Sequence, residues 1–95
     1  MIVIGRKKLD KFKRKHADAR GQVDAWLNET RGATWQTPKD IKTRYPHASI
    51  LAGNRVLFNI KGRSYRLVVV VRYVSGAVLI EWVGTHAEYD RLRFE

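Results

Sequence analysis

The stretch Gly84–Asp90, with the sequence GTHAEYD, holds the densest group of proton-transferring side chains in the chain. Its members include His86, Glu88, Tyr89 and Asp90. Imidazole and carboxylate groups take up protons, and a phenol donates a hydrogen bond to an anion. General acid–base catalysis requires groups of these types close together. The stretch is therefore either an acid–base site at the end of a sheet or a polar C-terminal tail.

The chain is strongly basic, with 19 Lys and Arg residues against 9 Asp and Glu, a formal net charge of +10. A positive charge of this size attracts polyanions, and nucleic acid is the first candidate partner. The charge exceeds the magnitude of roughly 2–8 usual for a small domain, which disfavours the alternative of a solvated basic surface. A membrane surface fits less well, because the basic segments lack a continuous apolar stripe with Trp or Phe anchors.

The composition excludes several classes of site. The absence of cysteine excludes disulfides, thiol catalysis and Cys-based zinc sites. His16, His47 and His86 have no spacing that would bring them together, and no phosphate-binding glycine loop is present, so we expect no metal and no cofactor. The longest apolar run, Leu67–Val71, is too short to cross a membrane, and the start MIVIGRKK has the wrong order for a signal peptide. We expect one cytoplasmic domain over residues 1–95.

Helices are predicted in the first half of the chain, after a short strand over residues 1–4. The segment Arg6–His16 is rich in helix formers and has Leu9 and Phe12 on one side. A second helix is predicted to begin with Asp18 as its N-cap and to end at Gly32. These helices are expected to bury their apolar sides against a sheet.

A short third helix is predicted by a group of N-terminal helix signals. Thr37 is placed as the N-cap, Pro38 at the first helical position, and Asp40 three residues after the cap. Pro46 is expected to stop this helix.

Strands are predicted over residues 55–60, 64–73 and 77–83, where apolar and β-branched residues alternate with polar ones. Their short connections predict an antiparallel meander. The fold class is therefore α+β, with the N-terminal strand and two to three helices packed on one face of a curved, mainly antiparallel sheet. The first strand is expected at an edge of that sheet.

Strand register then separates two faces, if Ser75-Gly76 forms a two-residue loop and Val74 pairs with Ala77. The face expected to be buried carries Val56, Phe58, Ile60, Tyr65, Leu67, Val69, Val71, Tyr73, Val78, Ile80 and Trp82. The face expected to be open carries Arg55, Leu57, Asn59, Lys61, Arg66, Val68, Val70, Arg72, Leu79, Glu81, Val83 and Thr85. In this register Arg66 lies opposite Thr85, one residue from His86.

The residues also carry a family resemblance. The segments DIKTRYPHASILAGNRVLFNIKGRSYRLVVVV (Asp40–Val71) and VGTHAEYDR (Val83–Arg91) resemble the RelE-like toxins of bacterial toxin–antitoxin pairs, and within them the HigB branch. The motifs FNIKG, YRLV and THAEYD are the most specific part of the likeness, which covers essentially the whole chain.

This resemblance implies a toxin of a type II toxin–antitoxin system. Such a protein would be a metal-independent mRNA interferase associated with the ribosome and neutralised by a HigA-type helix-turn-helix antitoxin. Two other hypotheses remain open from the sequence. One is a non-catalytic RNA- or ribosome-binding module that uses the same basic face. The other is an interaction protein that mainly binds its antitoxin and acts with it in repression.

Metal-independent RNA cleavage requires a base for the 2′-hydroxyl proton, an acid for the leaving 5′-oxygen, and cations over the phosphate. We expect His86 to carry the proton and Arg66 to clamp the phosphate; the alternatives are a strand-end cap and a strand arginine paired with a carboxylate. Glu88 is predicted to act as base or to orient His86, unless it is an ordinary surface carboxylate. Tyr89 is predicted to contact phosphate or a base, unless it fills the core, and Asp90 is expected to be structural.

Further basic and polar residues are predicted to contact RNA outside the catalytic group. Lys61 is expected to touch phosphate, with a solvated loop lysine as the alternative, and the N-terminal basic helix is expected to dock on ribosomal RNA, with a solvated face as the alternative. The predicted RNA-binding residues are Lys61, Arg55, Arg72, Asn59, Lys7, Lys8 and Lys11.

Overall fold

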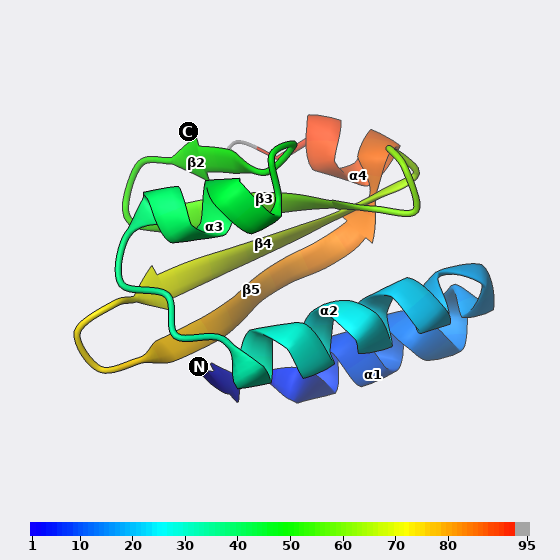
Figure 1. The fold of residues 1–95 in the computed structure, drawn as a ribbon. Helices are drawn as coiled ribbons and strands as arrows, with labels where there is room; N and C mark the ends of the chain where they lie inside the picture. The colour runs from blue at the N-terminus through cyan, green and yellow to red at the C-terminus, as the bar shows by residue number, and fades with distance from the viewer. Residues whose placement is uncertain (93–95) are drawn as a thin grey trace.

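The computed structural model describes residues 1–92 of the chain (Figure 1). In this part the helices are α1 (Arg6–Lys15), α2 (Arg20–Gly32), α3 (Pro38–Arg44) and α4 (His86–Asp90), with a 3₁₀ turn over Ala17–Ala19. The strands are β1 (Ile2–Ile4), β2 (Ser49–Leu51), β3 (Arg55–Ile60), β4 (Tyr65–Arg72) and β5 (Ala77–Thr85).

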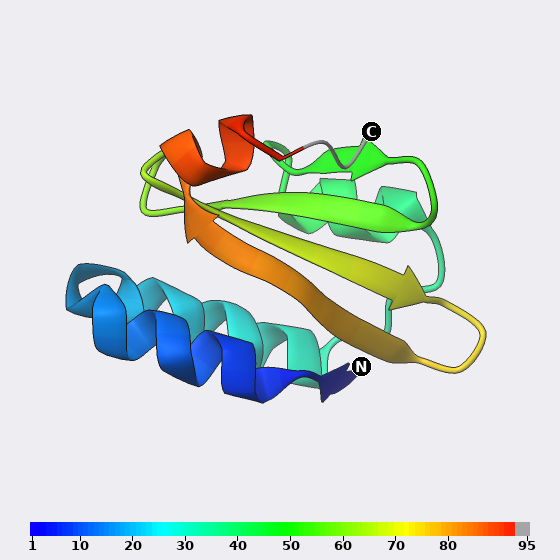
Figure 2. The same ribbon diagram turned by 180° about the vertical axis from the view of Figure 1, so that it is seen from behind.

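The strands form one open sheet in the order β1-β5-β4-β3-β2 (Figure 2). The β2–β3, β3–β4 and β4–β5 pairs are antiparallel, whereas β1 lies parallel to β5 at the edge. The α+β class and the edge position of the first strand are thus confirmed. The strand β2 has no counterpart in the sequence prediction, because its three residues are too few to show an alternation. None of the helices in the described range is long and apolar enough to cross a membrane.

Three of the four predicted helix ends are confirmed, including the end of α3 at Arg44, just before Pro46. Thr37 and Asp40 form the predicted capping box of α3 around Pro38, and Gly32 is the last residue of α2. The prediction of Asp18 as an N-cap is wrong. Asp18 lies in the 3₁₀ turn, and its carboxylate accepts hydrogen bonds from Lys61 and Tyr65 instead of from the helix backbone.

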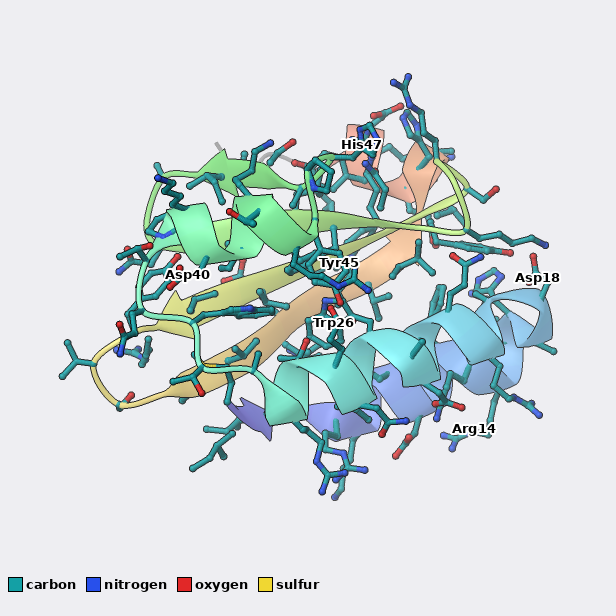
Figure 3. The ribbon with its side chains drawn as sticks, in the orientation of Figure 1. Arg14, Asp18, Trp26, Asp40, Tyr45 and His47 are labelled. Atoms are coloured by element: carbon teal, nitrogen blue, oxygen red, sulfur yellow. The ribbon has the colours of Figure 1, made fainter. Side chains whose placement is uncertain are left out.

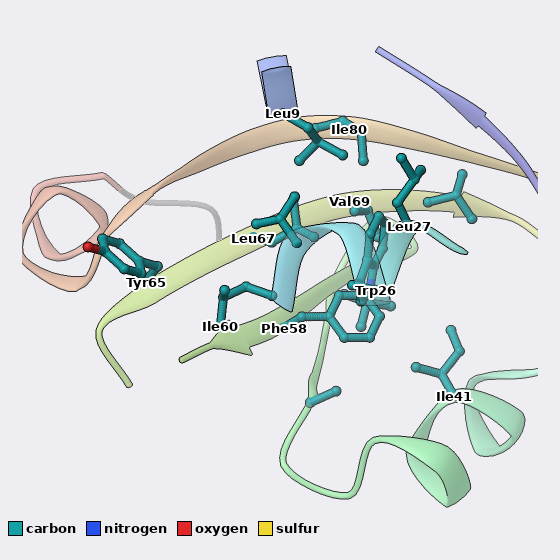
Figure 4. Packing of buried hydrophobic residues seen from close by; sticks show 14 of the residues in the cluster. Leu9, Trp26, Leu27, Ile41, Phe58, Ile60, Tyr65, Leu67, Val69 and Ile80 are labelled. Atoms are coloured by element: carbon teal, nitrogen blue, oxygen red, sulfur yellow. The ribbon is translucent and has the colours of Figure 1, made fainter. Parts of the chain in front are cut away.

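The main hydrophobic core lies between the sheet and the helices α1, α2 and α3 (Figure 4). Leu9 on α1, Val23 on α2 and Ile41 on α3 are almost completely buried against Phe58 and Leu67 of the sheet. Burial of one such side chain stabilises the fold by about 1.5–3 kcal/mol. This core fixes one face of β3, β4 and β5, and thereby the direction in which their opposite face points.

The predicted β4–β5 register is wrong, and two local features explain the difference. The connection is a four-residue turn over 73–76, in which the Gly76 amide donates to the Arg72 carbonyl at 2.9 Å, so that Arg72 pairs with Ala77. A β-bulge then places Val68 opposite Trp82 and Val69 opposite Ile80, which leaves Glu81 as the extra residue. A longer turn and a bulge each shift the pairing, and neither has a strong sequence signal.

The bulge reverses which side chains of β5 face the core beyond Glu81. Val83, predicted on the open face, packs against the main core, whereas Trp82, predicted in the core, packs on the opposite side. Thr85 faces Tyr65, and Arg66 faces Gly84 rather than Thr85. The end of β5 therefore presents its even-numbered residues to the face that carries Arg66.

The second face of the sheet carries its own small cluster. Leu57, Val68 and Tyr89 are buried there, and Trp82 and Leu51 pack against them. Tyr89 comes from α4, which contacts β4 and β5 at one end of the sheet (Figures 1 and 2). The predicted open apolar floor is consequently covered at this end by the C-terminal helix.

Candidate active site

The predicted site begins where β5 passes into α4. Thr85 has an extended backbone and is the N-cap of α4; its side chain accepts a hydrogen bond from the Glu88 amide at 3.1 Å. In return the Glu88 carboxylate accepts from the Thr85 amide at 2.8 Å. This reciprocal capping box satisfies two amides that the helix leaves unpaired. It fixes His86 as the first residue of the helix.

Arg66 and His86 are in direct contact. The sequence predicted that they lie near each other, with Arg66 opposite Thr85, whereas Arg66 pairs with Gly84. The Nη2 atom of Arg66 lies 2.8 Å from Nε2 of His86. A guanidinium only donates hydrogen bonds, so Nε2 is the acceptor and carries no proton in this arrangement. The proton of the neutral ring is then on Nδ1, which lies 3.2 Å from the Asp90 carboxylate.

Asp90 is the residue that this site gains over the sequence prediction. It follows His86 by four residues on α4, which places both side chains on one side of the helix. The side chains of His86 and Asp90 are 41% and 59% exposed, so both remain accessible to a ligand. The i, i+4 spacing of His and Asp was visible in the sequence, but it indicates a contact only once these residues are known to form a helix.

The guanidinium of Arg66 lies over the face of an aromatic ring. Its Cζ atom lies 4.7 Å from the ring centroid of Tyr89, and the ring of Tyr89 in turn contacts Trp82 at 5.9 Å between centroids. Tyr89 is only 8% exposed. A cation over an aromatic face is attracted by the ring, and the contact restricts the arginine to one position. Tyr89 is thus packed in the interior, which was one of its two predicted roles.

Glu88 points away from His86. Its carboxylate caps Thr85, and the backbone hydrogen bond from Thr85 lowers the pKa of Glu88, with a smaller contribution from the positive charge of Lys15. It lines a groove of about 270 Å³ between α1 and the end of β5. In this structure Asp90 is therefore the carboxylate that contacts the His86 ring, while Glu88 caps the helix that carries His86.

Gly84 has no side chain, which leaves space for Trp82 and Glu88 to pack over the backbone. A Cβ atom at this position would lie 2.7 Å from the Trp82 ring and 2.8 Å from the Glu88 carboxylate. Such distances force a neighbour to move. The close packing of Trp82 and Glu88 over the backbone thus depends on the absence of a side chain at Gly84.

Lys61 is held at the same end of the molecule by a separate network. Its Nζ atom lies 2.9 Å from the Asp18 carboxylate, which also accepts a hydrogen bond from Tyr65 at 2.8 Å. The hydrogen bonds from Lys61 and, to a lesser extent, from Tyr65 lower the pKa of Asp18. The hydrogen bond to Asp18 in turn raises the pKa of Lys61. The ammonium group is therefore partly neutralised, and it does not contact His86.

Arg55 and Arg72 lie at the opposite end of the sheet. Arg72 is six residues beyond Arg66 on β4, a distance of roughly 20 Å along a strand. The guanidinium of Arg55 lies 2.7 Å from Glu81, and this hydrogen bond raises the pKa of Arg55. The structure does not bring these two predicted RNA contacts to the His86 group.

The basic residues of α1 border the groove that Glu88 lines. Lys8 and Lys11 both line it together with Trp82, and the Nζ atom of Lys8 donates to the Glu81 carbonyl at 3.1 Å. Lys7 is exposed on the same helix. Lys8 and Lys11 are thus close to the α4 end of β5, whereas Asn59 borders a separate, larger groove.

The described residues contain no group of three or more His, Cys, Asp or Glu side chains that could hold a metal ion. The chemistry available from the geometry is that of a neutral imidazole between a carboxylate and a guanidinium. Such a group can accept a proton from a hydroxyl, and the guanidinium can bind an anion beside it.

Comparison with known proteins shows a family match. The family model HigB_toxin, described as the RelE-like toxic component of a toxin–antitoxin system, matches residues 19–92. This range includes the end of β5, α4 and every residue of the Arg66, His86 and Asp90 group. No curated protein matches the chain.

Proposed function

The chain belongs to the HigB family of RelE-like toxins, the toxic components of toxin–antitoxin systems, and from this premise we propose that it is a metal-independent endoribonuclease. The proposed substrate is mRNA, cleaved on the ribosome. The observation that carries the proposal is the 2.8 Å contact between Arg66 and His86, with Asp90 on the other side of the imidazole.

In the proposed first event, the guanidinium of Arg66 leaves His86 and binds the scissile phosphate. A phosphate offers a guanidinium two charged acceptor oxygens, which bind it more strongly than a neutral imidazole nitrogen does. This movement frees Nε2 of His86. His86 is thus free to act as a general base beside the bound phosphate, while Asp90 keeps the proton of the ring on Nδ1.

The proposed chemical step is attack of the 2′-hydroxyl on the adjacent phosphorus. His86 takes the hydroxyl proton at Nε2, the new O–P bond forms, and the bond to the 5′-oxygen breaks, giving a 2′,3′-cyclic phosphate and a 5′-hydroxyl end. Arg66 stabilises the charge that develops on the phosphate. We assign protonation of the leaving oxygen to water, since Glu88 caps Thr85 and Tyr89 packs beneath Arg66. The hydroxide that remains then takes the proton from the His86 imidazolium, which restores water and the neutral ring.

The proposed partners follow from charge and family. The net charge of +10 supports binding to ribosomal RNA and mRNA, chiefly by Coulomb attraction. A toxic component of a toxin–antitoxin system implies an antitoxin, and we propose the HigA type with a helix-turn-helix.

Inducible expression with primer-extension mapping of mRNA ends tests the proposal. Wild type is expected to produce new 5′ ends within translated messages and to arrest growth. His86→Ala and Arg66→Ala are expected to lower cleavage by at least about 100-fold. Arg31→Ala, an exposed residue of α2, serves as the matched control. If wild type and His86→Ala both arrest growth and neither produces new mRNA ends, the protein is a binding module and not this nuclease.

A further inference from the structure

The turn between β3 and β4, residues 61–64, connects the helical layer to the candidate active site. The Ser64 amide donates to the Lys61 carbonyl at 3.1 Å, which closes the turn. The Ser64 carbonyl accepts a hydrogen bond from the backbone amide of His86, also at 3.1 Å. His86 is the first residue of α4, and an amide at this position has no partner within the helix. The turn therefore supplies the partner that the His86 backbone needs.

The same turn also places Arg66. Arg66 follows Ser64 by two residues, at the start of β4. Tyr65, which separates them, pairs with Thr85, the residue before His86. The guanidinium and the imidazole, which meet at 2.8 Å, thus both take their positions from this end of β4. A displacement of the turn changes the distance between them.

The turn has an unfavourable backbone conformation at Lys61. Its φ angle is +53°, in the left-handed region that residues with a side chain rarely adopt. Such a conformation persists only where the surrounding structure holds it, and conformations held in this way cluster at functional sites. The contacts that hold Lys61 are therefore candidates for a role in the chemistry.

Two side chains from the helical layer hold Lys61. On α2, the Oε1 atom of Gln22 accepts a hydrogen bond from the Lys61 amide. In the 3₁₀ turn, the Asp18 carboxylate accepts from the Lys61 ammonium at 2.9 Å and from the Tyr65 hydroxyl at 2.8 Å. Figure 3 labels Asp18 at the end of the helix pair, on the same side of the molecule as the β3–β4 turn. Residues 18–22 thus fix both the backbone and the side chain of Lys61.

We infer that Gln22 and Asp18 are positioning residues, which hold the His86 imidazole in place beside Arg66 through the 61–64 turn. The inference rests on the proposed endoribonuclease function. The hydrogen bonds of Gln22 and Asp18 go to Lys61 and Tyr65, so their effect reaches His86 through the backbone of the turn. A displacement of about 1 Å at the reacting groups can cost a factor of about 100 in rate.

Two other roles compete with positioning. One is a contribution to stability alone, and the other is direct contact with RNA, because Gln22 lines the large groove. Gln22 separates these roles better than Asp18, because its side chain is exposed and forms no ion pair, so its loss changes stability little. A contact with RNA affects KM, whereas a positioning role affects kcat.

Cleavage of mRNA on purified ribosomes, measured over a range of complex concentrations, gives kcat and KM for the variants. Gln22→Ala removes the acceptor for the Lys61 amide, and we expect kcat to fall by about tenfold with little change in KM. Gln22→Glu keeps an acceptor oxygen at the same position and is expected to retain the wild-type kcat. Gln36→Ala, at an exposed glutamine that lines neither groove, is the matched control.

The ¹⁵N spectrum of the His86 ring tests the same connection without cleavage. In wild type Nε2 is expected as the acceptor and Nδ1 as the protonated nitrogen, and ¹⁵N shifts distinguish the two. Gln22→Ala and Asp18→Ala are expected to reduce this tautomer, and Gln22→Glu to keep it. The spectrum reports the folded protein directly, so a lower stability of Asp18→Ala does not affect the reading.

Several outcomes would overturn the positioning role. An unchanged kcat and ring spectrum in Gln22→Ala would remove it and leave the nuclease. A higher KM at constant kcat would show that Gln22 contacts RNA, and an equal loss in Gln22→Glu would show that the acceptor oxygen is not what matters. Ring spectra that change as expected in a chain that cleaves no RNA would support the connection to His86 and remove the nuclease.

Discussion

At the scale of single residues, Arg66 connects the features on which the proposed chemistry depends. Its Nη2 contacts His86, its Cζ lies over the Tyr89 ring, and its side chain also lines the large groove. Because a guanidinium is planar, these three directions are fixed relative to one another. A phosphate bound at Arg66 would therefore lie beside His86.

The contact between Asp90 and His86 gives a first prediction. Asp90→Asn removes the carboxylate that holds the Nδ1 proton, so the imidazole loses its preferred tautomer and orientation. We expect the cleavage rate to fall by roughly tenfold, less than the loss in His86→Ala. Asp10→Asn, an exposed carboxylate on α1, is the matched control. Single-turnover cleavage with circular dichroism of both variants checks this, and an unchanged rate in Asp90→Asn would mean that Asp90 has no orienting role.

Gly84 gives a second prediction. Gly84→Ala places a methyl group within 2.8 Å of Trp82 and Glu88, and we expect it to destabilise the fold by about 1–3 kcal/mol. Gly21→Ala, where a Cβ meets nothing within 4 Å, is expected to stabilise the protein by up to about 1 kcal/mol. Urea unfolding compares the two. Equal effects would show that Trp82 and Glu88 do not pack over Gly84 in solution.

At the scale of elements, the β-bulge and α4 determine where the site forms. The bulge turns Trp82 and Gly84 to the face of Arg66, and the capping box of Thr85 and Glu88 then starts the helix that carries His86 and Asp90. The bulge and the helix depend on each other, because Trp82 and Tyr89 pack together beneath the guanidinium.

The sequence predicted the α+β class, four of the strands and the α3 capping box from residue patterns and helix signals. It also predicted the meeting of Arg66 and His86, but through a register that is wrong. The errors arise from the four-residue turn before Ala77 and from the bulge at Glu81, since neither changes the local alternation enough to be read. Asp90 was expected to be structural, and its contact with His86 in particular was not predicted, because α4 has only five residues, too few for a periodic pattern.

The hydrogen bonds that Asp18 accepts from Lys61 and Tyr65 give a third prediction. The lowered pKa of Asp18 means that its hydrogen bonds with Lys61 and Tyr65 stabilise the fold above the unfolded-state pKa, about 3.9. This contribution is lost as the pH falls through the lower folded-state pKa. We therefore expect Asp18→Asn to melt at a lower temperature than wild type at pH 7, and the difference to shrink at pH 3.

Thermal unfolding of both proteins across this pH range measures the effect. The comparison with wild type isolates Asp18 from Glu88, whose pKa is also lowered but which is present in both proteins. A difference in melting temperature that stays constant from pH 7 to pH 3 would contradict the proposed charge contribution.

At the scale of the whole molecule, positive charge surrounds the site from several directions. The lysines of α1 border the small groove, and Arg44 and Arg63 border the large one. With a net charge of +10, attraction to RNA acts before any specific contact forms. Charge thus supports docking, while the residues around Arg66 support chemistry.

Salt dependence separates these two contributions and gives a fourth prediction. Replacement of Lys8, Lys11 and Lys15 by alanine is expected to lower the slope of log affinity against log salt by about 2 for single-stranded RNA. A triple replacement at Arg20, Arg31 and Lys39, which line neither groove, is the control. Fluorescence anisotropy at several salt concentrations measures both. Equal slopes in the two triples would show that the α1 lysines make no special contribution.

The most direct test of the central claim is the single-turnover cleavage rate of mRNA on purified ribosomes, measured for wild type and His86→Ala side by side. The account predicts that wild type yields 2′,3′-cyclic phosphate and 5′-hydroxyl ends and that His86→Ala is slower by at least about 100-fold, with ribosome binding retained. Cleavage by His86→Ala at the wild-type rate would contradict the assignment of the site.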